Sequence, residues 1–233
     1  MYSRDVPAMD STTKPQIWNL TTAQWSVYYW LLAHSKRNPS NKEPYYYIYR
    51  NSFTLKQIRN QTGIKTDKTL RQAFDVLNEK MIIICDESKN VFYIYPPLIY
   101  VPMNTSIICA LLAFNKYLNP GVTITMLAIF ARLSKFPKKI ELTKTEVAAL
   151  LGKAKQHIDE AGVVLSLYLL KGLELIDFSK HPYKNRMGVE CVSYRLEKVN
   201  IQKSLENFFV GDSFDNAKIE EYWAAANANS IGE

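Results

Sequence analysis

The chain has 233 residues, 47% of them hydrophobic, and a formal net charge of +7 at pH 7. This hydrophobic content supplies one large core or two small ones and excludes a wholly disordered chain. No apolar run approaches the roughly 20 residues of a membrane-spanning helix, and the polar N-terminus lacks the hydrophobic block of a signal peptide, so a cytoplasmic protein is expected.

The N-terminal part is expected to begin with a flexible arm over residues 1–16. A helix should start at residues 20–22, where a threonine can cap the free amide groups. Helical spacing predicts one apolar face, formed by Trp25, Tyr28, Tyr29 and Leu32. After a polar loop, the aromatic residues 45–49 predict a short strand.

Two helices joined by a turn are predicted next. Thr54 can cap the first helix, and Gly63 can end it in a left-handed conformation. Thr66 or Asp67 can cap the second helix. Its buried stripe is expected at Leu70, Phe74, Leu77 and Met81. The β-rich runs 81–85 and 91–95, with a polar stretch between them, predict a hairpin.

Prolines at 96, 97 and 102 lead into a second segment. An apolar helix is expected over residues 104–117 and is broken at 119–121. A further helix should start at Thr123 or Thr125.

Thr143 can cap the next helix, which holds Val147 and ends at Gly152. The helix after it has an inward face at Ile158, Ala161, Leu165, Tyr168 and Leu169. The β-rich runs 173–178 and 189–196 then flank a basic tip at residues 181–188.

The same order of short helix, glycine, basic turn, longer helix and β-rich run thus occurs twice, at residues 53–84 and 141–178. This is the order of a winged helix-turn-helix. The expected fold class is mainly α with small β wings (α+β), as two tandem winged helix-turn-helix domains over residues 17–100 and 101–203. Residues 204–233 form an acidic, aromatic tail, expected either to pack on the second domain or to bind a partner.

Positive charge is concentrated in the two domains. Residues 1–100 carry a net charge of +5 and residues 101–200 carry +6, whereas the last 33 residues carry −4. Between Arg50 and Gln72, six basic residues are opposed only by Asp67. Such faces attract polyanions, and the phosphate backbone is the commonest of these, although the same charge can serve solubility alone.

A recognition helix needs polar and basic side chains at its N-terminal end, where it enters the major groove. The DNA-binding candidates of the first domain are Arg50, Lys56, Lys65, Thr66, Lys68, Thr69, Arg71 and Gln72. Arg71 and Gln72 can pair with base edges, whereas Lys65 and Lys68 suit phosphates. The candidates of the second domain are Lys153, Lys155, Gln156 and His157 on the helix and Lys180, Lys184, Asn185 and Arg186 on the wing.

These faces also have other interpretations. They can be ordinary solvated helix faces, and winged helices also dimerise or bind proteins. In the second domain, Asp159 and Glu160 directly follow the basic cluster, so the wing is expected to matter more than the helix. The apolar run 162–170 covers more than one helix face and can close a partner interface.

The sequence carries no mark of an enzyme. It has no G-x-x-x-x-G-K-S/T loop that would cradle a nucleotide triphosphate. His34, His157 and His181 are scattered and make no metal-ligand spacing. Cys85, Cys109 and Cys191 form no CxxC pair and are expected as buried thiols. We therefore expect no catalytic residue, no metal and no cofactor.

With both segments placed, the chain resembles the tandem winged-helix replication initiators of plasmids and phages over roughly residues 20–199. The resemblance rests on LTTAQWSVYYWLL and FTLKQIRNQTGI…TLRQAFDVLNEKMII, and on a second round in TITMLAIFARL…ELTKTEVAALLG…LKGLELI. It implies binding to repeated origin DNA, a change between dimer and monomer, and residues 65–72 and 153–157 at the major groove. The chain departs from the family in its second helix, which has mixed charge, and in its short acidic end.

The expected function is sequence-specific binding of double-stranded DNA, in replication initiation at repeated origin sites. The alternatives are a transcriptional regulator of a mobile element, a scaffold whose winged helices bind protein, and a DNA-processing enzyme whose site carries no motif. The expected partners are duplex DNA, a second copy of the chain and a replication protein bound by the tail, with no membrane partner.

Overall fold

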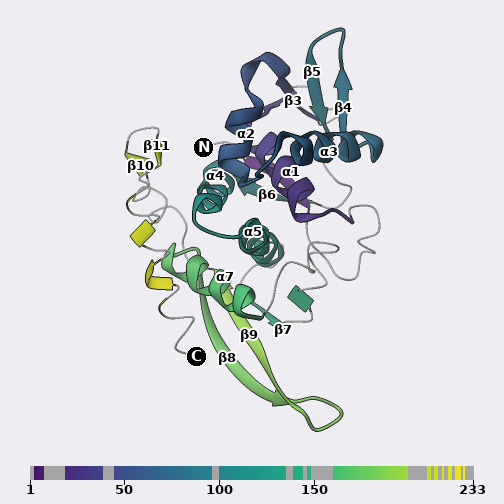
Figure 1. The fold of residues 1–233 in the computed structure, drawn as a ribbon. Helices are drawn as coiled ribbons and strands as arrows, with labels where there is room; N and C mark the ends of the chain where they lie inside the picture. The colour runs from purple at the N-terminus through teal and green to yellow at the C-terminus, as the bar shows by residue number, and fades with distance from the viewer. Residues whose placement is uncertain are drawn as a thin grey trace.

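The computed structural model describes residues 3–7, 19–38, 45–95, 100–134, 139–143, 146–147 and 160–198, with short pieces of the tail at 209–210, 213–214, 217, 220–221, 224–226 and 228. The fold is mixed α+β with small antiparallel sheets, which confirms the predicted class at this level (Figure 1).

The N-terminal unit, residues 19–95, alternates helices with short strands. Its elements are α1 (Thr22–His34), β2 (Lys36–Arg37), β3 (Tyr46–Tyr49), η2 (Arg50–Ser52), α2 (Leu55–Thr62), α3 (Asp67–Glu79), β4 (Ile83–Asp86) and β5 (Val91–Ile94). The predicted caps are confirmed: Thr21 and Thr54 form capping boxes, and Thr66 caps α3. The strand order is β2-β3-β5-β4, so β3 pairs with the last strand of the unit.

The C-terminal unit, residues 100–198, has the same kind of strand pairing as the N-terminal unit. Its elements are β6 (Tyr100–Asn104), α4 (Thr105–Ala113), η3 (Phe114–Lys116), α5 (Pro120–Ser134), β7 (Lys139–Thr143), α7 (Glu160–Gly172), β8 (Ile176–Lys184) and β9 (Glu190–Lys198). The sheet order is β7-β9-β8, so the strand after α5 again pairs with the last strand. In the tail, β10 (Phe209–Val210) pairs with β11 (Ser213–Phe214).

Helix α1 is the central element of the fold. All side chains from Trp25 to Leu32 are buried, Ser26 included, because α1 packs against α2, α3, α4 and α5 (Figure 1). The prediction of one apolar face was therefore too narrow: a helix surrounded by other helices is apolar on every side. Burying each large apolar side chain contributes roughly 1.5–3 kcal/mol, so α1 is a major source of stability.

The two units meet closely at the end of α2. Gly63 has a left-handed φ of +70°, as predicted, and a Cβ built there would lie 3.1 Å from the Asn115 carbonyl oxygen and 3.1 Å from Pro120 Cγ. The Asn115 amide donates a hydrogen bond to the Gln61 carbonyl oxygen at 3.1 Å. One hydrophobic cluster runs through both units and includes Ala226 of the tail. The predicted domains thus share a core.

Several local predictions were wrong. Part of the expected arm is a strand, β1 (Ser3–Pro7), which pairs antiparallel with β6. The chain leaves the helical conformation after η3, as predicted, but the next helix starts at Pro120 and not at Thr123 or Thr125. The Asn119 Oδ1 atom caps α5 by accepting from the Gly121 N–H at 2.9 Å. Proline suits this position, where its missing N–H would have no helical partner.

The stripe of α3 also ends earlier than predicted. Leu70 and Leu77 are buried and Phe74 is half-buried, but Met81 is 69% exposed. Met81 has a φ of +54°, and this turn directs the chain so that the next residue, Ile82, is buried instead. The hairpin β4–β5 follows as predicted.

Helix α7 contradicts the prediction of an apolar partner interface. Its residues 162–170 are buried or half-buried within the chain, because α7 packs against α5 and β8. The Ser166 hydroxyl lies 3.2 Å from the Val122 carbonyl oxygen of α5 and donates to it.

Candidate nucleic-acid interface

Glycine and threonine build the turn between α2 and α3. The Gly63 N–H donates to the Arg59 carbonyl oxygen at 3.0 Å and closes α2. Thr66 Oγ1 accepts from the Thr69 N–H at 3.1 Å, and the two hydroxyl oxygens lie 2.9 Å apart. Thr66 and Thr69, predicted to bind DNA, are exposed, but their hydroxyl groups stabilise the start of α3.

The outward face of α3 is basic at its N-terminal end. Lys65, Lys68, Arg71 and Gln72 are exposed, and none makes an ion pair with another residue in the described part of the chain. On the opposite face Leu70, Ala73 and Leu77 are buried. Burial of one face therefore directs the predicted base-contacting and phosphate-contacting side chains into solvent together.

Charge changes sign along α3. Its only acid in the first turn, Asp67, forms an ion pair of 3.0 Å with Arg59 of α2. The exposed Asp75 and Glu79 lie in the second half of the helix. The N-terminal end, which also carries the positive end of the helix dipole, is therefore where an anion is most stabilised.

Arg50 and Lys56, the two DNA-binding candidates that precede the turn, differ in their surroundings. The Arg50 guanidinium lies 5.5 Å from the centre of the Phe92 ring, and its Nη1 atom is 3.6 Å from Cys85 Sγ. Arg50 therefore lies against the hairpin β4–β5 and stabilises it through a cation–π contact. Lys56 is exposed in the first turn of α2.

In the C-terminal unit, the start of the predicted first helix is described. Thr143 Oγ1 accepts from the Glu146 N–H at 3.2 Å, and the Glu146 carboxylate accepts from the Thr143 N–H at 2.7 Å. Residues 146–147 are helical, and Val147 is buried. The predicted DNA-binding residues Lys153, Lys155, Gln156 and His157 lie outside the described residues.

The hairpin β8–β9 projects from the end of the molecule opposite β4–β5 (Figure 1). Its strands reach Lys184 and Glu190, so Lys184 is on strand β8 and not in the predicted tip at residues 181–188, and Lys180 lies on the same strand. Asn185 Oδ1 accepts from the N–H groups of Met187 (2.9 Å) and Val189 (3.0 Å). Asn185 was predicted to contact DNA, but its side chain holds the turn together.

The exposed tip of this hairpin combines charge with apolar surface. Lys184 and Arg186 are exposed, and Met187 beside them is 84% exposed. At the base of the hairpin, by contrast, charges are paired: Lys171 lies 2.7 Å from Asp177. This hydrogen-bonded ion pair lowers the pKa of Asp177. The distal half is thus the cationic part of the hairpin.

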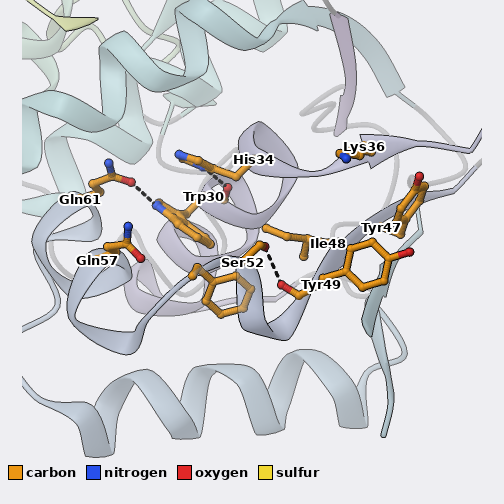
Figure 2. A pocket seen from close by; sticks show the side chains of 10 residues that line it. Trp30, His34, Lys36, Tyr47, Ile48, Tyr49, Ser52, Gln57 and Gln61 are labelled. Carbon is orange, nitrogen blue, oxygen red and sulfur yellow. Dashed lines mark hydrogen bonds between the residues drawn. The ribbon is translucent and has the colours of Figure 1, made fainter. Parts of the chain in front are cut away.

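A pocket that the sequence did not indicate lies between α1, β3 and α2 (Figure 2). Its volume is about 270 Å³, and it is lined by Trp30, His34, Lys36, Tyr47, Ile48, Tyr49, Ser52, Phe53, Gln57 and Gln61. The His34 ring stacks on the Trp30 indole with 4.3 Å between ring centres. Gln57 was detectable in the sequence only as the N3 residue of a capping box that starts at Thr54, which gives no sign of a pocket.

Among the described residues, no group of His, Cys, Asp and Glu side chains could hold a metal ion. Cys85, Cys109 and Cys191 form no disulfide and are half-buried, not fully buried as predicted. No described helix is both long and apolar enough to cross a membrane.

Comparison with known proteins identifies no relative of this chain. Neither the protein-family models nor the curated proteins nor the solved structures contain a match to this chain. Its function must therefore be argued from its own residues.

Proposed function

We propose that the chain binds double-stranded DNA in a sequence-specific manner, as a non-enzymatic cytoplasmic protein built from two tandem winged helix-turn-helix units. The observation that carries this proposal is the outward face of α3, where Lys65, Lys68, Arg71 and Gln72 are exposed and make no ion pair with a described residue, while Asp67 is engaged by Arg59.

The arrangement of elements supports the fold part of the proposal. In each unit a strand pairs with the last strand of a hairpin, in the orders β3-β5-β4 and β7-β9-β8. In the N-terminal unit α2 and α3 lie between the first strand and the hairpin, as in a helix-turn-helix followed by a wing.

In this proposal α3 lies in the major groove with its N-terminal end toward the bases. Arg71 pairs with guanine and Gln72 with adenine, because both side chains can make two hydrogen bonds to one base edge. Lys65 and Lys68 bind phosphates on either side. At the other end of the molecule, Lys184 and Arg186 hold a phosphate backbone with the tip of β8–β9.

The biological role we propose is replication initiation at repeated origin sites, on the resemblance of the sequence to plasmid and phage initiators. A second copy of the chain and a replication protein bound by the acidic tail are the proposed protein partners. A transcriptional regulator would use the same DNA contacts at a promoter.

The test is selection of bound duplexes from a random pool, followed by titration of the best duplex against salt. We expect an enriched sequence and an affinity that falls steeply with salt. The slope of log affinity against log salt concentration should be about −0.9 for each phosphate neutralised. Footprints over direct repeats would support the initiator, and footprints over a promoter the regulator. A pool without enrichment, and weak binding with little salt dependence, would contradict DNA recognition and favour a protein scaffold.

A further inference from the structure

The pocket beside Trp30 contains two amide groups whose orientation is fixed by chemistry. Gln57 Oε1 accepts from the Thr54 backbone N–H at 2.8 Å, and Gln61 Oε1 accepts from the Trp30 indole N–H. Both partners can only donate, so the oxygen of each amide must face them. Neither amide nitrogen makes a hydrogen bond with a described residue. Gln57 and Gln61, on neighbouring turns of α2, both line the pocket, and each keeps an amide nitrogen that can donate to a ligand there (Figure 2).

His34 adds an acceptor. Its Nδ1 atom lies 2.8 Å from the Trp30 carbonyl oxygen, which can only accept, so Nδ1 carries the proton. Burial against the indole lowers the pKa of His34, which favours the neutral ring. Nε2 of the neutral ring then carries a lone pair that accepts from no described residue.

The remaining walls supply ring faces and positive charge. The rings of Trp30 and Phe53 meet edge to face, with 5.3 Å between their centres. The rings of Tyr47 and Tyr49, on the same face of β3, meet in the same way with 5.9 Å between their centres. Lys36 lies at the opposite side of the pocket from the glutamines and makes no ion pair with a described residue (Figure 2).

We propose that this pocket binds one nucleotide: the base lies among the aromatic rings with its edge on the Gln57 and Gln61 amides and His34 Nε2, and the phosphate lies at Lys36. The pocket volume of about 270 Å³ lies just below the roughly 300–1,000 Å³ of typical small-molecule pockets, so the ligand must be small, such as a single nucleotide. The nucleotide is either free or an unpaired nucleotide of a single strand, for which base stacking on aromatic side chains is the usual mode.

An aromatic side chain of a peptide fits this set of groups less well. A tyrosine ring brings one hydroxyl group, so most of the donors and the lysine would lose water without gaining a partner. A nucleobase carries several donors and acceptors in its plane, and a phosphate gives Lys36 a charged partner.

The inference does not depend on duplex recognition, because the lining residues lie outside α3. The full-length chain is titrated with deoxyadenosine monophosphate, a short single-stranded oligonucleotide, inorganic phosphate and N-acetyltyrosinamide, and tryptophan fluorescence is followed because Trp30 forms a wall. We expect saturable binding of the nucleotide and the oligonucleotide, and far weaker binding of phosphate and of the tyrosine derivative. An oligonucleotide that binds at least about tenfold more tightly than the nucleotide identifies a single strand as the source, and equal affinities identify the free nucleotide.

The decisive variant is Gln57→Glu. Its carboxylate still accepts from the Thr54 N–H, so the capping box and the fold are kept, as circular dichroism can verify. The amide donor to the base edge is lost and a negative charge enters a pocket that binds an anion, so nucleotide affinity should fall about tenfold or more. The control is Gln72→Glu, the same change on α3, which should leave nucleotide binding unchanged and weaken duplex binding.

Three results would overturn the pocket assignment: no saturable binding of either nucleic-acid probe, equal affinity for N-acetyltyrosinamide or phosphate, or equal effects of Gln57→Glu and Gln72→Glu. Loss of duplex binding with intact nucleotide binding would instead contradict the proposed function and leave the pocket assignment standing.

Discussion

The guanidinium group of Arg59 in α2 lies 3.0 Å from the carboxylate of Asp67, the first residue of α3. This pair joins the two helices and engages the acid that the sequence places among six basic residues. Since the two side chains are 37% and 52% exposed, the pair contributes only about 0–1 kcal/mol to folding. Its larger effect is on the electrostatic potential at the start of α3.

Replacing Asp67 by asparagine should strengthen duplex binding at little cost in stability. The change removes a negative charge from the proposed interface and frees Arg59 for a phosphate, so the salt slope should steepen by about one. Fluorescence anisotropy at several salt concentrations measures both effects. Asp75→Asn, farther along α3, should change affinity less, and weaker binding by Asp67→Asn would contradict the orientation proposed for α3.

Arg71→Ala should lower affinity by about 1–3 kcal/mol and relax the preference at one base pair. The physical reason is the loss of two hydrogen bonds to a base edge. Selection of duplexes by the variant checks the preference. Lys80→Ala, an exposed change beyond the C-terminal end of α3, is the matched control. If Arg71→Ala weakened all duplexes equally, Arg71 would be a phosphate ligand.

Removing the cations of the hairpin tip should weaken binding without changing sequence preference. In the double variant Lys184→Ala, Arg186→Ala the salt slope should fall by about two, because each charge accounts for about one phosphate. Arg195→Ala removes a cation of the same hairpin that already lies 4.0 Å from the Glu141 carboxylate. This control should leave the slope nearly unchanged, and an equal effect of both variants would indicate a general charge effect.

Gly63→Ala and Gly188→Ala separate backbone strain from crowding. Both glycines have positive φ, +70° and +77°, but only the Cβ at 63 would meet neighbours, at 3.1 Å. Each change should cost about 1–2 kcal/mol from the left-handed backbone, and Gly63→Ala about 1–3 kcal/mol more from crowding. Denaturant unfolding measures the difference. Equal losses of stability in the two variants would show that Asn115 and Pro120 move away from the added Cβ at little cost.

Much of the local structure could be predicted because it is encoded within a few residues. Thr21, Thr54, Thr66 and Gly63 act through hydrogen bonds to near neighbours or through their own φ, so the sequence reveals them. Exposure of Arg71 followed in the same way from the spacing of Leu70 and Leu77 on the opposite face.

What the sequence did not reveal depends on distant contacts. Burial of every face of α1 requires α4 and α5, and the strand β1 exists through its pairing with β6. The pocket at Trp30 joins residues from α1, β2, β3 and α2, whose approach no local pattern encodes. The turn-forming hydrogen bonds of Asn185 were not foreseen, because a polar residue in a basic turn can serve either the ligand or the turn.

The environment of His34 predicts a pH dependence of stability. Burial against Trp30 lowers the pKa of His34, and the hydrogen bond to the Trp30 carbonyl oxygen opposes this only in part. In the unfolded chain the group titrates near its ordinary value of about 6.5, so below that pH the unfolded state binds more protons than the folded state. The stability contribution is therefore present above about pH 6.5 and is lost as the pH falls toward the folded pKa.

This can be measured as the drop in melting temperature between about pH 7.5 and about pH 5.5, which should be smaller in His34→Gln than in the wild type. Lys36, the charged neighbour in the pocket, is present in both proteins. An unchanged drop in His34→Gln would show that other groups cause the acid sensitivity.

The enclosure of α1 has a consequence for how evolution can be read in this protein. Of residues 25–32 only Trp30 lines a proposed binding site, yet almost any change in this segment would leave a cavity or a clash. Among descendants of this sequence the most invariant positions should therefore fall there, while Arg71 and Gln72 drift as the recognised DNA changes. Sequence conservation would therefore mark the buried core around α1, and the residues that determine DNA specificity would be among the variable positions.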